Sequence, residues 1–178
     1  IAQRKYENAI KEYIIASQQF PNEIRLLKSL AYTLYNTDQL EESLGIVEKI
    51  LKLNSTHLFA RILKGRIMLK KRDSSNALQS FQNILIDYPD WPPAHYYSAL
   101  AYFDLGHREL ARDSLQKTLC HDETNLPAML LLAKEYLHDQ SLQEATSLCN
   151  RALEISPTSV EAHILNGQIH VLKKDMSK

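Results

Sequence analysis

The chain of 178 residues contains few of the residue types on which most enzymes and disulfide-rich proteins depend. Its four glycines are scattered, and no two lie close enough together to form a phosphate-binding loop. Two cysteines do not make a disulfide framework, and we expect two free thiols, with Cys149 buried at a helix-packing position. The longest apolar-rich stretch, residues 128–137, contains Lys134 and Glu135 and is too short to span a bilayer. We therefore expect no membrane insertion.

Charge of one sign is not in excess either, because 21 Lys and Arg residues balance 21 Asp and Glu residues. A basic excess normally accompanies nucleic-acid binding, so we expect no nucleic-acid partner. The basic run at residues 61–72 could contact phosphates or an acidic peptide. Its charges spread around the predicted helix, which favours a solvated face balanced by acids elsewhere.

Clusters that could carry chemistry are also missing from the sequence. His163 and His170 lie two helical turns apart, whereas metal-binding pairs commonly lie one turn apart with a third converging ligand. No nucleophile motif or pair of carboxylates stands out among the acidic residues. We therefore predict no metal site, no cofactor and no catalytic residues, and expect that the chain is not an enzyme.

What the sequence does contain is an uninterrupted repeat, with the same residue types returning at a step of 34 positions, as from Ala9 to Ser43. Small residues, larger apolar residues and helix breakers each keep this step along the chain. A repeat of this length indicates stacked supersecondary units rather than one globule. The two series of small residues are Ala9, Ser43, Ala77, Ala111 and Ala145, and Ala31, Gly65, Ala99, Ala133 and Gly167.

The spacing inside one unit explains why these residue types recur. Residues 92–123 contain two amphipathic helical patterns, separated by a turn at Gly106 and His107. Two antiparallel helices approach closely only where side chains are small, which accounts for Ala99 and Ala111. A single pair cannot bury its apolar stripe, so it stacks on its neighbours. The sequence therefore predicts an all-α solenoid of antiparallel helix pairs.

These positions resemble the tetratricopeptide repeat family, most clearly in residues 92–125 and 126–159. The resemblance implies a right-handed superhelical array, with a non-catalytic role in binding a protein or peptide partner. Ser43 and Thr118 replace the usual alanines of the family, which puts the packing at those two positions in question. The family positions kept in the last full unit are Ala128, Ala133, Tyr136, Ala145, Ala152 and Pro157.

In this frame the whole chain, 1–178, is one array, which we interpret as a fragment of a bacterial tetratricopeptide repeat protein. Residues 1–23 are the second helix of a partial repeat, and residues 160–178 are the first helix of a further one. Both terminal helices then expose faces that a neighbour would cover, so self-association through them is an open alternative. The full repeats are 24–57, 58–91, 92–125 and 126–159.

In this family the first helix of each repeat lines a concave groove, where partners usually lie. Aromatic side chains beside Lys and Arg suit an extended or helical peptide with apolar residues and a carboxylate. The alternative is that several of these aromatics only pack against the adjacent repeat. The predicted groove residues are Arg25, Lys28, Tyr32, Tyr35, Asn36, Phe59, Ile62, Arg66, Lys70, Tyr96, Phe103, Asp104, Lys134 and His138.

One known use of the family can be tested on the sequence. Members that hold the C-terminal carboxylate of chaperones use Lys or Asn, Asn, and Lys or Arg on successive first helices. Lys28 matches this clamp, but Tyr32, Leu63, Pro93 and Tyr97 occupy its other positions. We therefore expect no carboxylate clamp of that type.

The leading functional hypothesis is a protein-interaction scaffold that binds along the groove. The alternative is a recruiting or regulatory arm of a larger enzyme, or of a bacterial envelope or exopolysaccharide-export assembly. The second alternative comes from a similarity of residues 95–119 and 127–137 to repeats in bacterial envelope proteins. The sequence leaves both a cytoplasmic and a periplasmic or envelope-associated location open.

Overall fold

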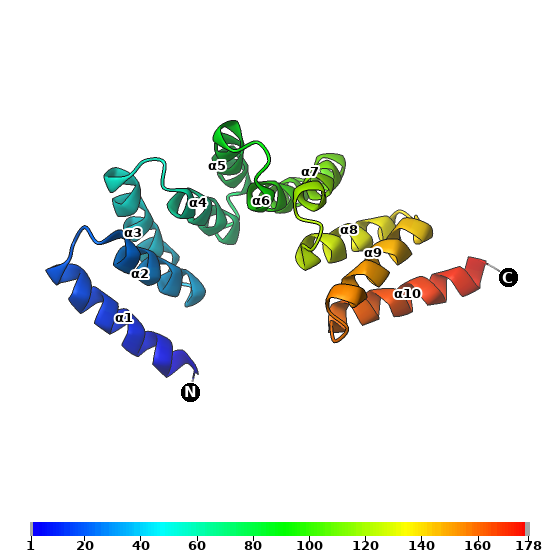
Figure 1. Cartoon of the computed structure of the whole chain (residues 1–178), viewed down its shortest axis with the longest axis horizontal. Coiled ribbons are helices and arrows are strands. Elements are labelled where there is room, and N and C mark those ends of the chain that lie inside the picture. The colour runs from blue at the N-terminus through cyan, green and yellow to red at the C-terminus, as the bar shows by residue number, and fades with distance from the viewer. Residues whose placement is uncertain (1, 177–178) are drawn as a thin grey trace. The chain divides into compact units, whose positions relative to one another are not determined.

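The computed structural model describes residues 2–176, and in this part of the chain it contains ten α-helices and no strand (Figure 1). The outermost ends of the predicted partial repeats, at residue 1 and residues 177–178, lie outside the described residues. The helices are α1 (Ala2–Gln19), α2 (Ile24–Asn36), α3 (Leu40–Leu53), α4 (Leu58–Lys70), α5 (Ser74–Asp87), α6 (Pro92–Asp104), α7 (Arg108–His121), α8 (Leu126–His138), α9 (Leu142–Ile155) and α10 (Val160–Met176).

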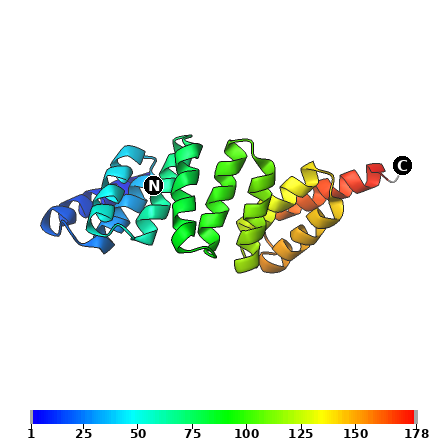
Figure 2. The same cartoon turned by 90° about the horizontal axis from the view of Figure 1, so that it is seen from above.

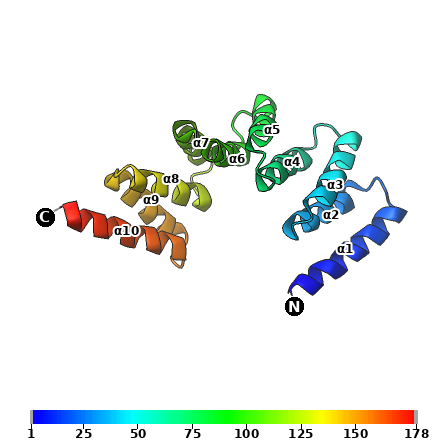
Figure 3. The same ribbon diagram turned by 180° about the vertical axis from the view of Figure 1, so that it is seen from behind.

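The helices fall into two compact units, Ile1–Pro89 and Asp90–Lys178. In the first unit α2 packs on α3 and α4 on α5, with α1 against α2 (Figure 3). In the second unit α6 packs on α7 and α8 on α9, with α10 against α9 (Figure 2). The predicted all-α repeat of helix pairs is thus confirmed. None of the helices in the described part of the chain has the length and apolarity needed to cross a membrane.

Each pair is joined by a short turn that contains one residue in the left-handed region. These residues are Asp38, Arg72, Gly106 and Gln140, with φ of 63°, 63°, 79° and 59°. The next residue in each turn donates its backbone N–H to a carbonyl in the last turn of the first helix, as Gln39 does to Leu34 at 2.9 Å. This bond satisfies a carbonyl that the helix end would leave unpaired.

The closest approach of two paired helices occurs at a small residue of the first helix. A Cβ added at Gly65 of α4 would lie 2.6 Å from Cζ of Phe81, a fully buried residue of α5. In the preceding pair the hydroxyl of Ser43 donates to the carbonyl of Ala31 at 2.7 Å. The serine therefore fits its buried position by bonding across the pair, whereas Thr118 fits by donating to the carbonyl of Ser114 within its own helix.

The second helices supply fully buried residues at two further positions of the 34-residue repeat. Every one of these side chains in α3, α5, α7 and α9 has an exposed fraction of 0%. Their burial supplies the main stabilising free energy, about 1.5–3 kcal/mol for each large apolar side chain. The residues are Val47, Ile50, Phe81, Ile84, Leu115, Thr118, Cys149 and Ala152.

The tight contact at Gly65 generates a stability prediction. Gly65→Ala should lower the free energy of unfolding by about 1–3 kcal/mol, because the new methyl group would push the buried Phe81 ring from its place. Gly45→Ala in α3 should raise it by about 0.5–1 kcal/mol, because a Cβ there meets nothing within 4 Å and alanine favours helix. Urea unfolding followed by circular dichroism measures both. Equal effects of the two substitutions would contradict the proposed contact.

Candidate protein-interaction site

Two stripes of aromatic and basic side chains face each other across the first helices of the first unit. On α2 the residues Lys28, Tyr32 and Tyr35 follow helical spacing, so they share one side of the helix. On α4 the residues Phe59, Arg66 and Lys70 do the same, and α4 contacts α2. We call these six residues the α2–α4 face.

Cations and aromatic rings alternate across the α2–α4 face. The ammonium of Lys28 lies 5.1 Å from the centre of the Phe59 ring, and that of Lys70 lies 4.4 Å from the centre of the Tyr35 ring. The guanidinium of Arg66 lies over both tyrosines, 4.7 Å from the Tyr35 ring and 5.9 Å from the Tyr32 ring. Each such contact contributes about 0.5–1 kcal/mol and fixes the position of a long side chain.

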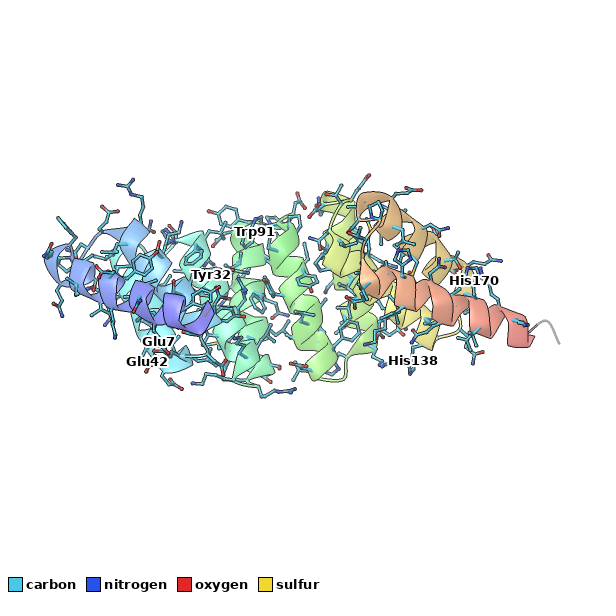
Figure 4. The ribbon with its side chains drawn as sticks, turned by 90° about the horizontal axis from the view of Figure 1, so that it is seen from below. Glu7, Tyr32, Glu42, Trp91, His138 and His170 are labelled. Atoms are coloured by element: carbon cyan, nitrogen blue, oxygen red, sulfur yellow. The ribbon has the colours of Figure 1, made fainter. Side chains whose placement is uncertain are left out.

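The rings of the α2–α4 face differ in how much solvent they meet. Tyr35 and Phe59 are half-buried and pack against the core of the first unit. Tyr32, labelled in Figure 4, is 42% exposed, although its ring lies 6.4 Å from those of both Tyr35 and Phe59. The two interpretations of the aromatics therefore apply to different residues, since two of the rings pack and one is available to a partner.

Lys70 is already bound to a carboxylate. Its ammonium donates to the carbonyl of Tyr35 at 3.0 Å and lies 3.3 Å from Oδ1 of Asp38. Asp38 is the left-handed residue in the turn after α2, and that conformation brings its side chain to α4. Sequence reasoning missed this contact. The available signal was an Asp at the turn position, a residue type that tolerates the left-handed region.

The basic run at residues 61–72 is balanced by acids on neighbouring helices, as the sequence interpretation expected. Nη1 of Arg61 lies 2.5 Å from Oδ2 of Asp87, and Nζ of Lys71 lies 2.8 Å from Oε1 of Glu41. Both acids are at least half exposed to water, so each pair contributes about 0–1 kcal/mol. These pairs involve two of the four basic residues of the run that lie outside the α2–α4 face.

Three other residues predicted for the first unit lie away from this face. Arg25 is at the first turn of α2, where its Nε donates to Glu23, the residue that caps the helix. Asn36 is exposed at the end of α2. Ile62 is only 8% exposed, because neighbouring side chains cover most of its surface, and its role in the groove stays a prediction.

In the second unit the predicted aromatics lie closer to the core. Tyr96 and Phe103 of α6 are half-buried and pack against the core cluster of that unit, whereas Asp104 is exposed. Burial raises the pKa of the Tyr96 hydroxyl, with smaller contributions from Tyr97 and Glu161. These two aromatics are therefore better placed to support the unit than to anchor a partner.

Lys134 and His138 border an open pocket of about 770 Å³ between α8 and α10. His138, labelled in Figure 4, lies 2.9 Å from Nη1 of Arg108 and 3.2 Å from Oδ1 of Asp139. The hydrogen bond from His138, followed by the charge of Arg112, holds the pKa of the Asp139 carboxyl below its usual value. The pocket is lined by Lys134, Leu137, His138, Gly167, Gln168, Val171 and Leu172.

Both cysteines are free thiols, as expected, with Cys120 exposed and Cys149 buried. Burial raises the pKa of the Cys149 thiol, so its reactive thiolate is less populated than that of an ordinary cysteine. Among the described residues no group of three or more His, Cys, Asp or Glu side chains could hold a metal ion.

Comparison with known proteins gives the family of this repeat. Residues 96–160 match the model of the tetratricopeptide repeat family. None of the curated proteins compared with the chain matches it in sequence.

Solved structures extend the likeness over most of the chain. TTC0263, a thermophilic tetratricopeptide repeat protein of Thermus thermophilus, is 20% identical, with a TM-score of 0.79 over 96% of this chain and 93% of that one. MamA of Desulfovibrio magneticus is also 20% identical, with a TM-score of 0.70 over 87% and 88% of the two chains. YrrB, a tetratricopeptide repeat protein with an unusual peptide-binding site, is 20% identical, with a TM-score of 0.66 over 91% and 84%.

The fold over the described residues is that of an all-α helical repeat protein. Residues 96–160 contain the tetratricopeptide repeat of the family model, and the solved structures show the same fold over most of the remainder of the chain. Proteins built from this repeat are generally non-catalytic and bind other proteins.

Proposed function

We propose that this chain is a non-catalytic scaffold that binds a peptide or protein partner on the faces of its first helices. The observation that carries the proposal is the α2–α4 face, where the exposed ring of Tyr32 lies among cations that other rings hold in place. Exposed aromatics and Arg are the side chains that most often dominate binding free energy.

The side chains of the α2–α4 face are held in place before a partner binds, and this supports the proposal. Binding normally costs about 0.5–1.5 kcal/mol for each flexible side chain that becomes fixed. Arg66 and Lys70 already lie against Tyr35, so their ordering cost has largely been met before a partner arrives. The pocket beside Lys134 gives the second unit an apolar surface of its own, without the stacked rings.

Charge reversal tests the proposal. A variant with Lys28→Glu, Arg66→Glu and Lys134→Glu should bind a partner selected on the wild-type chain at least about tenfold more weakly, because it opposes charge on both faces. Isothermal titration measures the affinity, and circular dichroism checks the fold. A variant with Lys52→Glu on the second helix α3 is the control. Undiminished binding by the triple variant would reject the model.

A second proposal concerns association of two copies through their terminal helices. The residues Ala9, Tyr13 and Ala16 of α1 are only half-buried, whereas their counterparts in α3, α5, α7 and α9 are fully buried. On α10 a Cβ added at Gly167 meets nothing within 4 Å, whereas Gly65, at the same repeat position, lies under Phe81. Tyr13 holds the repeat position of Phe81, so α1 of one copy suits the open side of α10 of another.

Light scattering across a concentration series tests this association. The apparent mass should rise with concentration, and it should continue past the dimer because a head-to-tail contact does not close on itself. Gly167→Glu should hold the chain as a monomer, because it places a charge on the proposed contact. A wild-type chain of constant monomer mass would contradict the second proposal.

A further inference from the structure

Two lysines of the α2–α4 face have similar settings, since each ammonium lies over a ring, but Lys70 also contacts the carbonyl of Tyr35 and the carboxylate of Asp38. Lys70 lies over the Tyr35 ring and beside the carboxylate of Asp38. Lys28 lies over the Phe59 ring in a similar way, but among the described residues no acidic side chain pairs with it. The contacts of Lys70 thus indicate that a carboxylate is the group that suits Lys28.

We propose that Lys28 binds a Glu or Asp side chain of the partner, with a large apolar side chain of the same segment against Tyr32. This inference rests on the proposed function of the α2–α4 face and specifies its ligand as an acidic, apolar segment. Lys28 and Tyr32 are four residues apart on α2, so they lie on adjacent turns of one side. Neighbouring residues of one segment can therefore reach both.

Charge complementarity supports an acidic segment. The α2–α4 face itself carries three cations and no acid, and Asp38 beside it lies 3.3 Å from Lys70. Two of the other basic residues of this region, Arg61 and Lys71, already pair with Asp87 and Glu41. An acidic segment is thus drawn to Lys28 more strongly than to Arg61, Lys70 or Lys71, each of which already lies beside an acid.

A side-chain carboxylate is favoured over a chain terminus. Capture of a terminal carboxylate commonly uses several convergent donors, including backbone or amide groups. The position beside Lys28 offers one ammonium over a ring, and this is also what Lys70 offers to the Asp38 side chain. The existing contact within the chain is therefore a direct model for the proposed one.

A double-mutant cycle tests the inference with defined probes. One synthetic peptide carries Glu next to Phe in a Ser- and Gly-rich background, and the other has Gln in place of each Glu. Wild-type protein should bind the Glu peptide about two- to fivefold more tightly, a ratio typical of a partly exposed ion pair. Lys28→Met should reduce this ratio to about one, and Lys28→Arg should retain most of it.

Lys52→Met is the matched control, because it makes the same change on the second helix α3, away from the α2–α4 face, and it should leave the ratio unchanged. Tyr32→Ala should weaken both peptides, since it removes the ring against which Phe packs. A ratio near one in wild type, or a ratio insensitive to Lys28→Met, would overturn the carboxylate assignment. If both peptides still lose affinity with Tyr32→Ala, the face remains the binding surface. If neither peptide binds, or Tyr32→Ala changes nothing, the proposed function of this face fails with it.

Discussion

The close approach of two helices at a small residue is the constraint on which the rest of the structure depends. At Gly65 this approach leaves no room for even a methyl group beside Phe81, and Ala31 meets Ser43 through a buried hydrogen bond. Because the contact recurs with the repeat, it fixes the same side of every first helix against its second helix. The side that carries Tyr32, Arg66 and Lys134 does not make this contact, and its residues differ from repeat to repeat.

This variation explains how one fold carries two different surfaces. Tyr32, Arg66 and Lys134 occupy the same repeat position, yet the first two stack in the α2–α4 face and the third borders an open apolar pocket. Cations held against rings keep their charge at the surface while their long side chains are ordered. The first unit therefore presents cations that are ordered against rings, and the pocket between α8 and α10 of the second unit is lined mainly by apolar groups.

The fold was predictable because the residues that pack between the helices return at a fixed step of 34 positions in the sequence. The step from Ala31 to Gly65 gives the helix pairs directly, and burial follows for residues such as Phe81. The site was predictable only in part. Helical counting placed Lys28, Tyr32 and Arg66 on one side, but burial of Ile62 depends on neighbouring helices that counting does not include.

The contact between Lys70 and Asp38 was beyond sequence reasoning for a different reason. It depends on a left-handed backbone residue in the turn, and three of the four turn residues of this kind are not glycine. Their conformation is imposed by the helix ends that they join, so residue type alone does not reveal it. Partners of exposed charges are decided by such local geometry.

Mapping of amide chemical shifts in the isotope-labelled chain, during titration with the peptide that carries Glu next to Phe, tests the central claim most directly. The account predicts that the largest shifts occur on α2 and α4, around Lys28, Tyr32 and Arg66, with small shifts on the second helix α3. Shifts concentrated on α3 and α5, or spread evenly over the chain, would contradict a binding surface on the first helices.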